Sequence, residues 1–417
     1  MDPASDNSSV VLYRAPWVIP VTSPIIQDGV VAVKGSRIIA VGLWSELSLL
    51  YPDDQTYHCS GLLMPGLINA HIHLELSIYG VVPQENAEST MCDWVRSLLH
   101  KRMTADYAEK EINTAAEQCA KEQYASGVVV LLDTGNNPLP QFTAKIPEIY
   151  SLLELLGPTE KATDVMSGIL NNLSTEKQPT GHAPYSTAPR LLQNIKEHTL
   201  KKGTLFSLHV AENPDESLLL FQGKGCFFDF LQERDALDGT FPLPKDRYLS
   251  VIDYLEKTHI LDDKTICVHC VYVNDADIKI IAKKRSHVCL CPSSNKFIGV
   301  DVAPLKAFLA GNILPALGTD STASNPQMNM WHEMELLRRE FADVPSATIL
   351  AMATIAGAKA LGRETDYGSI EAGKSSHFLG VEDEKISTAT CEKELLDILT
   401  SIEKPEKVTH FNDHLAG

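Results

Sequence analysis

Residues 67–74 read LINAHIHL, an apolar run that ends in two histidines. Seven further runs follow, mostly apolar, and longer amphipathic segments separate them. This alternation is typical of repeated βα units. The eight runs occupy residues 67–74, 127–135, 149–157, 178–184, 204–212, 265–270, 287–294 and 313–321. Eight units over about 300 residues predict an α/β fold of the (β/α)8 TIM-barrel type.

The segments on either side of these units have a different pattern. The first sixty residues read as short strands separated by turns, with Lys34-Gly35-Ser36 as a hairpin turn. The stretch YGSIEAGKSSHFLGVED (367–383) is β-like again. Because the termini of domains often lie close together, we predict that residues 1–63 and 364–417 form one small β-domain. The barrel, residues 64–363, would be inserted between its two halves.

Composition limits the possible partners. The 417 residues include 36 Lys and Arg against 54 Asp and Glu, which gives a formal net charge of −18. Such a negative field disfavours a general binder of nucleic acid or of anionic membranes. The longest purely apolar stretch, residues 128–132, is far shorter than a membrane span. We therefore expect a small-molecule substrate and no nucleic-acid or membrane partner.

The cysteines favour a reduced, cytoplasmic protein. There are nine of them, an odd number, and the first residues, MDPASDNSSV, lack the basic and apolar regions of a secretory signal. Cys267 and Cys270 have CxxC spacing, and Cys289 and Cys291 have CxC spacing. Both pairs fall in predicted buried strands, so we interpret them as core residues and not as a zinc ribbon.

His71 and His73 occupy alternate positions at the end of the first run. Because side chains alternate faces along a strand, both imidazoles point in the same direction. Two converging imidazoles are the start of a site for Zn²⁺ or Fe²⁺. The alternative is a pair of histidines that only form hydrogen bonds at a strand end.

Polar residues also end three other predicted strands: His209, His269 and Asp320. Barrel enzymes build their active sites at this rim, so the set favours a metal centre over unrelated core residues. Glu212 follows His209 by three residues, where a carboxylate can lie beside an ion and transfer protons. The alternative for Glu212 is an ordinary carboxylate at a helix start.

Five motifs occur in order: MPGLINAHIHLELS (64–77), HVAEN (209–213), VHC (268–270), CPSSNKFIG (291–299) and LGTDSTASN (317–325). Together they resemble the amidohydrolase superfamily. More narrowly, they are similar to its mononuclear branch of adenosine-type, S-adenosylhomocysteine and guanine deaminases and triazine chlorohydrolases. The resemblance covers nearly the whole chain. It implies a (β/α)8 barrel inserted in a small split β-sandwich, and dimers are common in this branch, so a homodimer is expected.

The resemblance also implies a role for each residue at the rim. One divalent ion would be bound, zinc or alternatively iron. Its ligands would be His71, His73, His209 and Asp320. His269 would hold the attacking hydroxide, Asp320 would take the first proton, and Glu212 would protonate the ring nitrogen and pass protons to departing ammonia. No lysine ends a predicted strand, which favours one ion over a pair bridged by a carboxylated lysine.

Two residues are candidates for substrate contact. His182, in GHAPYS, matches a substrate-contacting histidine of adenosine-type deaminases; the alternative is a loop histidine bonded to nearby backbone. Trp94 lies where this branch has a lid, and its indole could cover a purine face, although a lone Trp is more often packing. Arg96 and Arg102 share that segment and could meet a carboxylate or a ribose; exposed arginines are the alternative.

The segments HLELS and GTDSTASN resemble the corresponding sequences of aminodeoxyfutalosine deaminases, which act in menaquinone biosynthesis. This resemblance makes 6-aminodeoxyfutalosine the expected substrate. Two departures from that pattern occur; the first weakens the match, and the second concerns the sandwich domain and not the chemistry. Ser293 stands where those members carry a basic residue, and residues 375–377 read SSH instead of Lys/Arg-Ala-Asp.

Other activities stay open. S-adenosylhomocysteine, methylthioadenosine or guanine deamination, triazine dechlorination and cyclic-amide hydrolysis could all use the same metal site, because the pocket chooses the leaving group. A scaffold without activity is disfavoured, since every expected ligand and acid–base residue is present.

Overall fold

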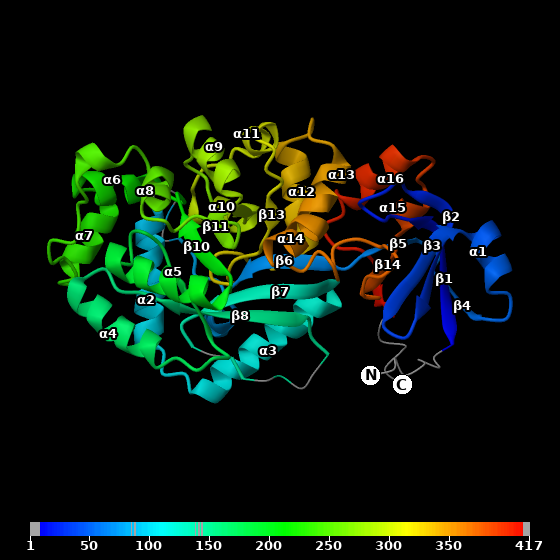
Figure 1. Cartoon of the computed structure of the whole chain (residues 1–417), viewed down its shortest axis with the longest axis horizontal. Coiled ribbons are helices and arrows are strands. Elements are labelled where there is room, and N and C mark those ends of the chain that lie inside the picture. Colours follow the sequence, from blue (N-terminus) through cyan, green and yellow to red (C-terminus); the bar gives the residue numbers. More distant parts are fainter. Residues whose placement is uncertain are drawn as a thin grey trace. The chain divides into compact units, whose positions relative to one another are not determined.

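The computed structural model describes residues 9–84, 86, 89–137, 139–140, 142 and 145–411 (Figure 1). Its contacts divide the chain into two compact units. One contains residues 69–121 and 131–328, and the other contains residues 1–68, 122–130 and 329–417. The second unit joins segments from both ends of the chain, as an insertion requires. The predicted boundaries after residues 63 and 363 stay a prediction.

The second unit contains a seven-stranded sheet with strands from both ends of the chain (Figure 1). Its order is β15-β14-β5-β1-β2-β3, and β4 pairs with β1 outside this path. The strands are β1 (Val10–Val18), β2 (Ile26–Lys34), β3 (Arg37–Leu43), β4 (Gln55–His58), β5 (Leu62–Pro65), β14 (Phe378–Glu382) and β15 (Lys407–His410). The two flanks therefore share one sheet, while the sandwich itself stays a prediction.

Both faces of this sheet are covered by apolar side chains, because residues of β1 alternate between the faces. On one face Tyr13 packs against Phe378 and Phe411, with ring centroids 5.2 and 4.8 Å apart. On the other face Leu12 belongs to a separate cluster with Leu47 of α1 (Trp44–Leu50). Burial of each such side chain contributes roughly 1.5–3 kcal/mol.

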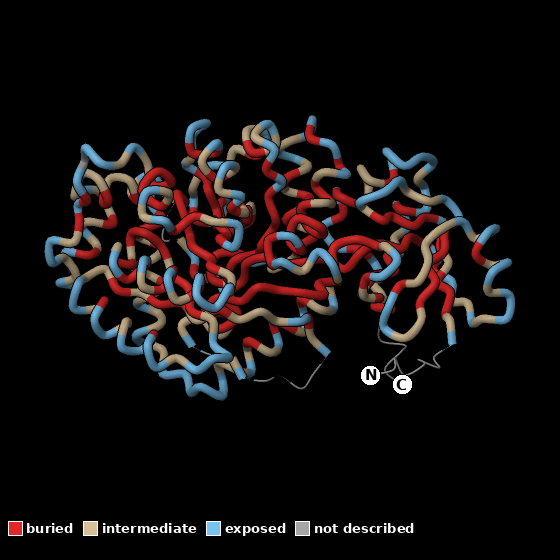
Figure 2. Tube along the Cα trace, viewed as in Figure 1, coloured by how far each residue is buried: buried red, intermediate tan, exposed pale blue. Residues whose placement is uncertain are grey.

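Two further sheets have the orders β6-β7-β8-β9 and β10-β11-β12-β13. Their strands are β6 (Leu67–Ile72), β7 (Val128–Gly135), β8 (Glu148–Leu155), β9 (Gln178–Gly181), β10 (Phe206–Val210), β11 (Thr265–His269), β12 (His287–Leu290) and β13 (Ala316–Leu317). Each of the eight predicted runs thus contains a strand. The pairs β8–β9, β10–β11, β11–β12 and β12–β13 are parallel. Every residue of β6, β7, β10 and β11 is buried (Figure 2), as is usual for parallel sheets covered on both faces.

Backbone contacts join these two sheets at both edges. At one edge the N–H of His209 donates to the carbonyl of His182 at 2.9 Å. At the other edge Ile72 and Asp320 form a parallel bridge, and the N–H of Asp320 donates to the carbonyl of His71 at 3.0 Å. The carboxyl end of β10 therefore lies beside that of β9, and the carboxyl end of β6 lies beside that of β13.

The helices carry clear local signals at their ends. The Thr90 side chain accepts from the N–H of Asp93, and the Asp93 carboxylate accepts from the N–H of Thr90, a capping box that begins α2 (Met91–Thr104). α3 (Glu109–Ala125) is followed by Gly127 at φ +102°, a conformation that favours glycine. No helix among the described residues has both the length and the apolar character to cross a bilayer.

The helices from α2 to α11 are α2 (Met91–Thr104), α3 (Glu109–Ala125), α4 (Glu160–Asn171), α5 (Pro189–Lys202), α6 (Pro214–Gln222), α7 (Cys226–Glu233), α8 (Val251–Lys257), α9 (Asp275–Lys284), α10 (Pro292–Ile298) and α11 (Leu305–Ala310). Those nearer the C-terminus are α12 (Met330–Glu340), α13 (Ser346–Ala351), α14 (Gly357–Ala360), α15 (Glu384–Ser387) and α16 (Glu392–Leu399). Two 3-10 helices, η1 (Leu74–Tyr79) and η2 (Lys245–Arg247), and one π-helical turn, η3 (Met352–Ala356), complete the set.

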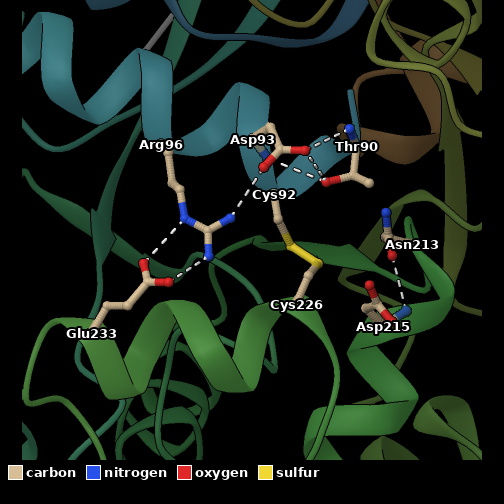
Figure 3. The surroundings of a disulfide bond; sticks show 8 residues. All are labelled: Thr90, Cys92, Asp93, Arg96, Asn213, Asp215, Cys226 and Glu233. Atoms are coloured by element: carbon tan, nitrogen blue, oxygen red, sulfur yellow. Dashed lines mark hydrogen bonds and ion pairs between the residues drawn. A yellow bond between two sulfur atoms is a disulfide. The ribbon is translucent and has the colours of Figure 1, made fainter. Parts of the chain in front are cut away.

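The prediction that all cysteines are reduced thiols is wrong for two of them. Cys92 in α2 and Cys226 in α7 form a disulfide, with Cα atoms 6.1 Å apart (Figure 3). They are 134 residues apart in the sequence, so the packing of α2 against α7 alone brings them together. Cys267 and Cys289 are buried free thiols, as expected for core residues.

Candidate metal centre and active-site pocket

Four predicted metal ligands meet at the carboxyl ends of three strands. His71 lies in β6 and His73 directly follows it, so the alternation of the strand turns both imidazoles in one direction. His209 lies near the end of β10, and Asp320 follows β13 by three residues. One ligand atom from each lies within 4.8 Å of the others, and all four residues are buried. Their role as ligands stays a prediction.

The separations suit groups that share a central ion. His73 Nε2 lies 3.3 Å from His209 Nε2 and 3.5 Å from Asp320 Oδ1. His71 Nε2 lies 3.8 Å from the same oxygen of Asp320. Ligand atoms that surround Zn²⁺ tetrahedrally at about 2.0–2.2 Å lie roughly 3.3–3.6 Å from one another.

Backbone carbonyls orient two of the imidazoles. His73 Nδ1 donates to the carbonyl of Thr134 at 2.8 Å, and His209 Nδ1 donates to the carbonyl of His182 at 2.8 Å. With the proton on Nδ1, each neutral ring keeps a lone pair on Nε2. Both Nε2 atoms are therefore available to an ion.

His71 shows that the cluster fits a bound ion. Both of its ring nitrogens are buried, and neither finds a hydrogen-bond partner in the part of the chain that the structure describes. Leaving a buried polar atom unsatisfied costs about 1–3 kcal/mol, and coordination would satisfy one of these atoms. Three imidazoles and one carboxylate are also a donor set that Zn²⁺ and Fe²⁺ accept.

The carboxylate of Asp320 is fixed on the side away from the histidines. Its Oδ2 accepts from Ser294 Oγ at 2.5 Å and from Ser324 Oγ at 2.9 Å. Oδ1 is left to face the imidazoles. The backbone φ of Asp320 is +59°, in the left-handed region that is uncommon for a non-glycine residue and recurs at functional sites.

His269 and Glu212 lie beside the ligand cluster and face each other. His269 Nδ1 donates to Asn295 Oδ1 at 2.9 Å, and its Nε2 lies 3.4 Å from Glu212 Oε1. The ring centroid of His269 is 5.4 Å from that of His209 and 6.1 Å from that of His71. An imidazole and a carboxyl group therefore lie at the edge of the four predicted metal ligands, where they could transfer protons.

Burial sets the ionisation of these groups. It lowers the pKa of His73 and that of His269 to about 4, so both rings are neutral at pH 7. Burial, with the charges of Asp320 and Glu216, raises the pKa of Glu212 well above its ordinary value and favours the protonated carboxyl. For Asp320, burial opposes ionisation, but the facing histidines outweigh it and lower the pKa.

A pocket adjoins this cluster. Its polar lining includes His73, His209, Glu212 and Asp320. Much of its apolar lining comes from two helices, with Trp94, Val95 and Leu98 from α2 and Phe227, Phe230 and Leu231 from α7. An apolar pocket with a few convergent polar groups is typical of sites for small organic ligands. We call the α2 and α7 residues in this lining the apolar wall.

Both predicted substrate residues line the pocket. His182 follows β9; its Nδ1 lies 2.5 Å from Ser186 Oγ, and its ring centroid is 4.7 Å from that of His209. Trp94 is buried in the apolar wall, and its Nε1 donates to the carbonyl of Val82 at 3.0 Å. Their contact with a substrate stays a prediction.

The two arginines of α2 have different surroundings. Arg102 lines the pocket, where its Nη2 lies 3.4 Å from Glu75 Oε1. Arg96 instead pairs with Glu233 at 3.1 Å and with Asp93 at 3.3 Å (Figure 3). Of the two, Arg102 is the one placed to meet a ligand.

The sequence reasoning missed two buried carboxyl groups that line the pocket, Glu75 and Glu154. Glu75 accepts hydrogen bonds from the backbone and side-chain N–H groups of Asn137, at 2.9 and 3.1 Å. Glu154 Oε1 lies 3.8 Å from His209 Nδ1, and burial raises the pKa of Glu154 well above its ordinary value. A lone glutamate inside the run IYSLLELLG was the signal that could have found Glu154.

Comparisons with known proteins agree on one family. A sequence profile of the amidohydrolase family matches residues 62–410. A 5-methylthioadenosine/S-adenosylhomocysteine deaminase from Moorella thermoacetica is 25% identical over 406 residues, covering 89% of this chain and 85% of that protein.

Two solved structures share the fold. Helicobacter pylori aminofutalosine deaminase in complex with methylthio-coformycin gives a TM-score of 0.77 and 22% identity, covering 96% of this chain and 98% of that one. An adenosine deaminase from Xanthomonas campestris with bound zinc gives a TM-score of 0.74 and 21% identity, covering 96% of this chain and 91% of that one.

Proposed function

Because the chain belongs to the amidohydrolase family, we propose that it is a metal-dependent deaminase that replaces the exocyclic amino group of an adenine-type nucleoside with oxygen and releases ammonia. Such a deaminase is a hydrolase that acts on carbon–nitrogen bonds other than peptide bonds. The observation that carries the proposal is the convergence of three histidines and Asp320 on one point, beside Glu212, within one pocket.

We assign one divalent ion to the cluster, zinc, with iron as the alternative. When bound, the ion acts as a Lewis acid and lowers the pKa of a coordinated water towards neutrality. His71, His73 and His209 would hold it as neutral ligands, and Asp320 would add one negative charge. The bound zinc of the Xanthomonas campestris structure supports a metal and suggests zinc.

Glu212 is assigned as the general acid. Its raised pKa favours a protonated carboxyl at neutral pH, so it can donate to the ring nitrogen beside the carbon under attack and then carry protons to departing ammonia. His269 is held through Nδ1 by Asn295, so its Nε2 can position the attacking water. Asp320 is ionised beside the histidines and would accept the first proton.

For the substrate we propose 6-aminodeoxyfutalosine, with S-adenosylhomocysteine, methylthioadenosine and guanine as alternatives. The apolar wall, with Trp94 and Phe227, suits an aromatic base, and His182 lies close to the cluster. Ser293, where a basic residue was expected, is buried in α10. Arg102 is a cation in the pocket lining that could meet a carboxylate in its place.

The architecture and assembly complete the proposal. The contacts at both edges of the two four-stranded sheets support a closed (β/α)8 barrel, and the shared seven-stranded sheet supports the split β-sandwich around it. We propose a cytoplasmic homodimer without a nucleic-acid or membrane partner. Light scattering on the purified protein would give twice the mass of the chain for a dimer.

The test of the activity is ammonia release by the purified protein, loaded with zinc or with iron. The panel contains aminodeoxyfutalosine, S-adenosylhomocysteine, methylthioadenosine, adenosine and guanine. A kcat/KM above about 10⁴ M⁻¹ s⁻¹ for one member would establish deamination and identify the substrate. The control is His71→Ala, which should lose both the metal and the activity.

No ammonia from any member, with metal bound, would contradict the proposal of a nucleoside deaminase. The same loaded protein would then be screened against chlorinated triazines and cyclic amides, which place a different leaving group at the same cluster.

A further inference from the structure

We propose that the Cys92–Cys226 disulfide is a reducible clamp that holds α2 against α7 and thereby positions the apolar wall of the pocket. With the bond closed, the wall is held for substrate binding. With the bond open, α2 and α7 separate more readily and the substrate binds more weakly, while the metal cluster is unaffected. Only this effect on substrate rests on the proposed function.

The two cysteines lie directly next to residues of the wall. Cys92 is in the first turn of α2, two residues before Trp94. Cys226 is the first residue of α7, directly before Phe227 (Figure 3). Both Trp94 and Phe227 line the pocket. A movement of either helix at the sulfur bridge therefore moves an aromatic side chain of the wall.

An ion pair links the same two helices but is too exposed to replace the covalent bond. Arg96 Nε and Nη2 lie 3.2 and 3.1 Å from the two carboxylate oxygens of Glu233 (Figure 3). The Glu233 side chain is 58% exposed, so water and salt screen the pair and leave it a small stabilising effect. Opening the disulfide would leave this pair and side-chain packing to hold α2 against α7.

The bond is open to exchange from one side. Cys92 is buried, whereas Cys226 is only half buried. A thiolate of an external dithiol would attack Cys226 Sγ, break the S–S bond and release Cys92 as a thiolate, which takes up a proton. The second thiol of the dithiol then attacks the reductant sulfur that is bonded to Cys226. This step forms a disulfide within the reductant and releases Cys226 as a thiol. Two electrons and two protons pass from the dithiol to the protein.

Asp215 and the two reduced cysteines could instead form a second metal site. The carboxylate oxygen of Asp215 lies within 4.8 Å of both sulfur atoms, so two thiolates and this carboxylate could hold a divalent ion. Three such ligands fall short of the four that structural zinc sites use. The structure pairs the sulfurs with each other, so we favour the clamp and make a second bound ion an outcome of the test.

The experiment compares the oxidised holoenzyme with the same protein reduced by dithiothreitol under nitrogen. Alkylation and intact mass should show two additional reactive cysteines after reduction. Amide hydrogen exchange should rise about tenfold or more in α2 and α7 and stay unchanged in β6 and β10. With the best substrate of the panel, KM should rise roughly 5–10-fold, while kcat changes less than about twofold.

The double variant Cys92→Ser/Cys226→Ser should reproduce the hydrogen exchange and the KM of the reduced state without any reductant, which excludes an effect of dithiothreitol on the metal. The matched control is Cys391→Ser, because Cys391 is an exposed free thiol and its loss should leave the hydrogen exchange and the KM unchanged. If the double variant does not fold, the reduced wild type supplies the comparison by itself.

Unchanged exchange in α2 and α7 after reduction would overturn the clamp. A second equivalent of metal in the reduced protein would also overturn it. Faster exchange in both helices, in a protein that deaminates nothing in the panel, would leave the clamp standing and refute the proposed function.

Discussion

Burial raises the pKa of Glu212 and makes this residue suitable as a proton donor. A carboxylate is unfavourable away from water, and here it also faces the charges of Asp320 and Glu216. Its pKa is therefore raised, and the side chain holds a proton that a reaction can use. The same burial lowers the pKa values of His71 and His209 and keeps both rings neutral. One pocket thus holds a protonated carboxyl group beside neutral imidazoles.

Glu212→Gln should retain the metal and lose turnover by roughly 10²–10⁴-fold, because an amide has no acidic proton to donate. Metal analysis and steady-state kinetics on the same preparation would measure both effects. An exposed residue, Glu176→Gln, is the matched control. Full activity in Glu212→Gln would remove it from the acid–base role.

Glu216 makes stability depend on pH. Burial raises its pKa from the ordinary 4.5 to about 8, although the N–H groups of Ala211 and Glu212 offset part of the shift. From pH 4.5 to about 8 the folded chain keeps a proton that the unfolded chain has lost, so the unfolding free energy falls as pH rises. The full effect is about 5 kcal/mol at most.

Glu216→Gln should therefore show a shallower decline in stability between pH 5 and 8 than wild type, by up to about 1.4 kcal/mol per pH unit. Urea unfolding at several pH values, with saturating metal, would measure the slope for both proteins. Glu176→Gln should keep the wild-type slope. Identical slopes for Glu216→Gln and wild type would contradict the proton on Glu216.

At the scale of elements, the close approach of β13 to β6 fixes one metal ligand. A Cβ added at Gly318 would lie 2.8 Å from both Cβ and the carbonyl oxygen of His71, and 3.0 Å from Cys289 Sγ. A backbone carbonyl cannot move aside as a flexible side chain can. Gly318 therefore permits the strand spacing that places His71 in the cluster.

Gly318→Ala should weaken metal binding roughly 10–100-fold, as other changes that reorient a ligand do. Competition with a chromophoric chelator would measure the dissociation constant. The control is Gly168→Ala in α4, because no atom lies within 4 Å of a Cβ added there, and an exposed helical alanine is favourable. Equal affinity in both variants would show that β13 does not position His71.

The elements of the site were predictable where the sequence repeats a pattern. Each apolar run that ends in His or Asp became a strand, and His71, His73, His209 and Asp320 met as predicted from their strand ends. Glu154 was not predicted, because a single carboxylate inside an apolar run does not repeat along the sequence and so forms no pattern. The Cys92–Cys226 pair escaped because its contact depends on how two helices pack and not on local sequence.

For the whole molecule, the metal should stabilise only part of the chain. All four ligands lie in the unit of residues 69–121 and 131–328. An ion at a thousandfold excess over its dissociation constant adds about 4 kcal/mol to the unfolding free energy of what it binds. Without the metal, the buried ring nitrogens of His71 have no hydrogen-bond partner among the residues that the structure describes.

Removing the metal with a chelator should lower one thermal transition, and adding zinc should restore it. Differential scanning calorimetry would measure the midpoint of that transition with and without the metal. His71→Ala should show no response to zinc. A wild-type transition that zinc does not move would contradict the assigned ligands.

The seven-stranded sheet also has a consequence for how the chain is made. β5 pairs with β1 on one side and with β14 on the other. The start of β14 follows the end of β5 by 378 − 65 = 313 residues. At roughly 5–20 residues per second, a ribosome delivers β14 about 15–60 s after β5. During that time β5 is an edge strand with open N–H and carbonyl groups, so the nascent chain depends on chaperones or on the growing insert to keep that edge from pairing with the wrong strand.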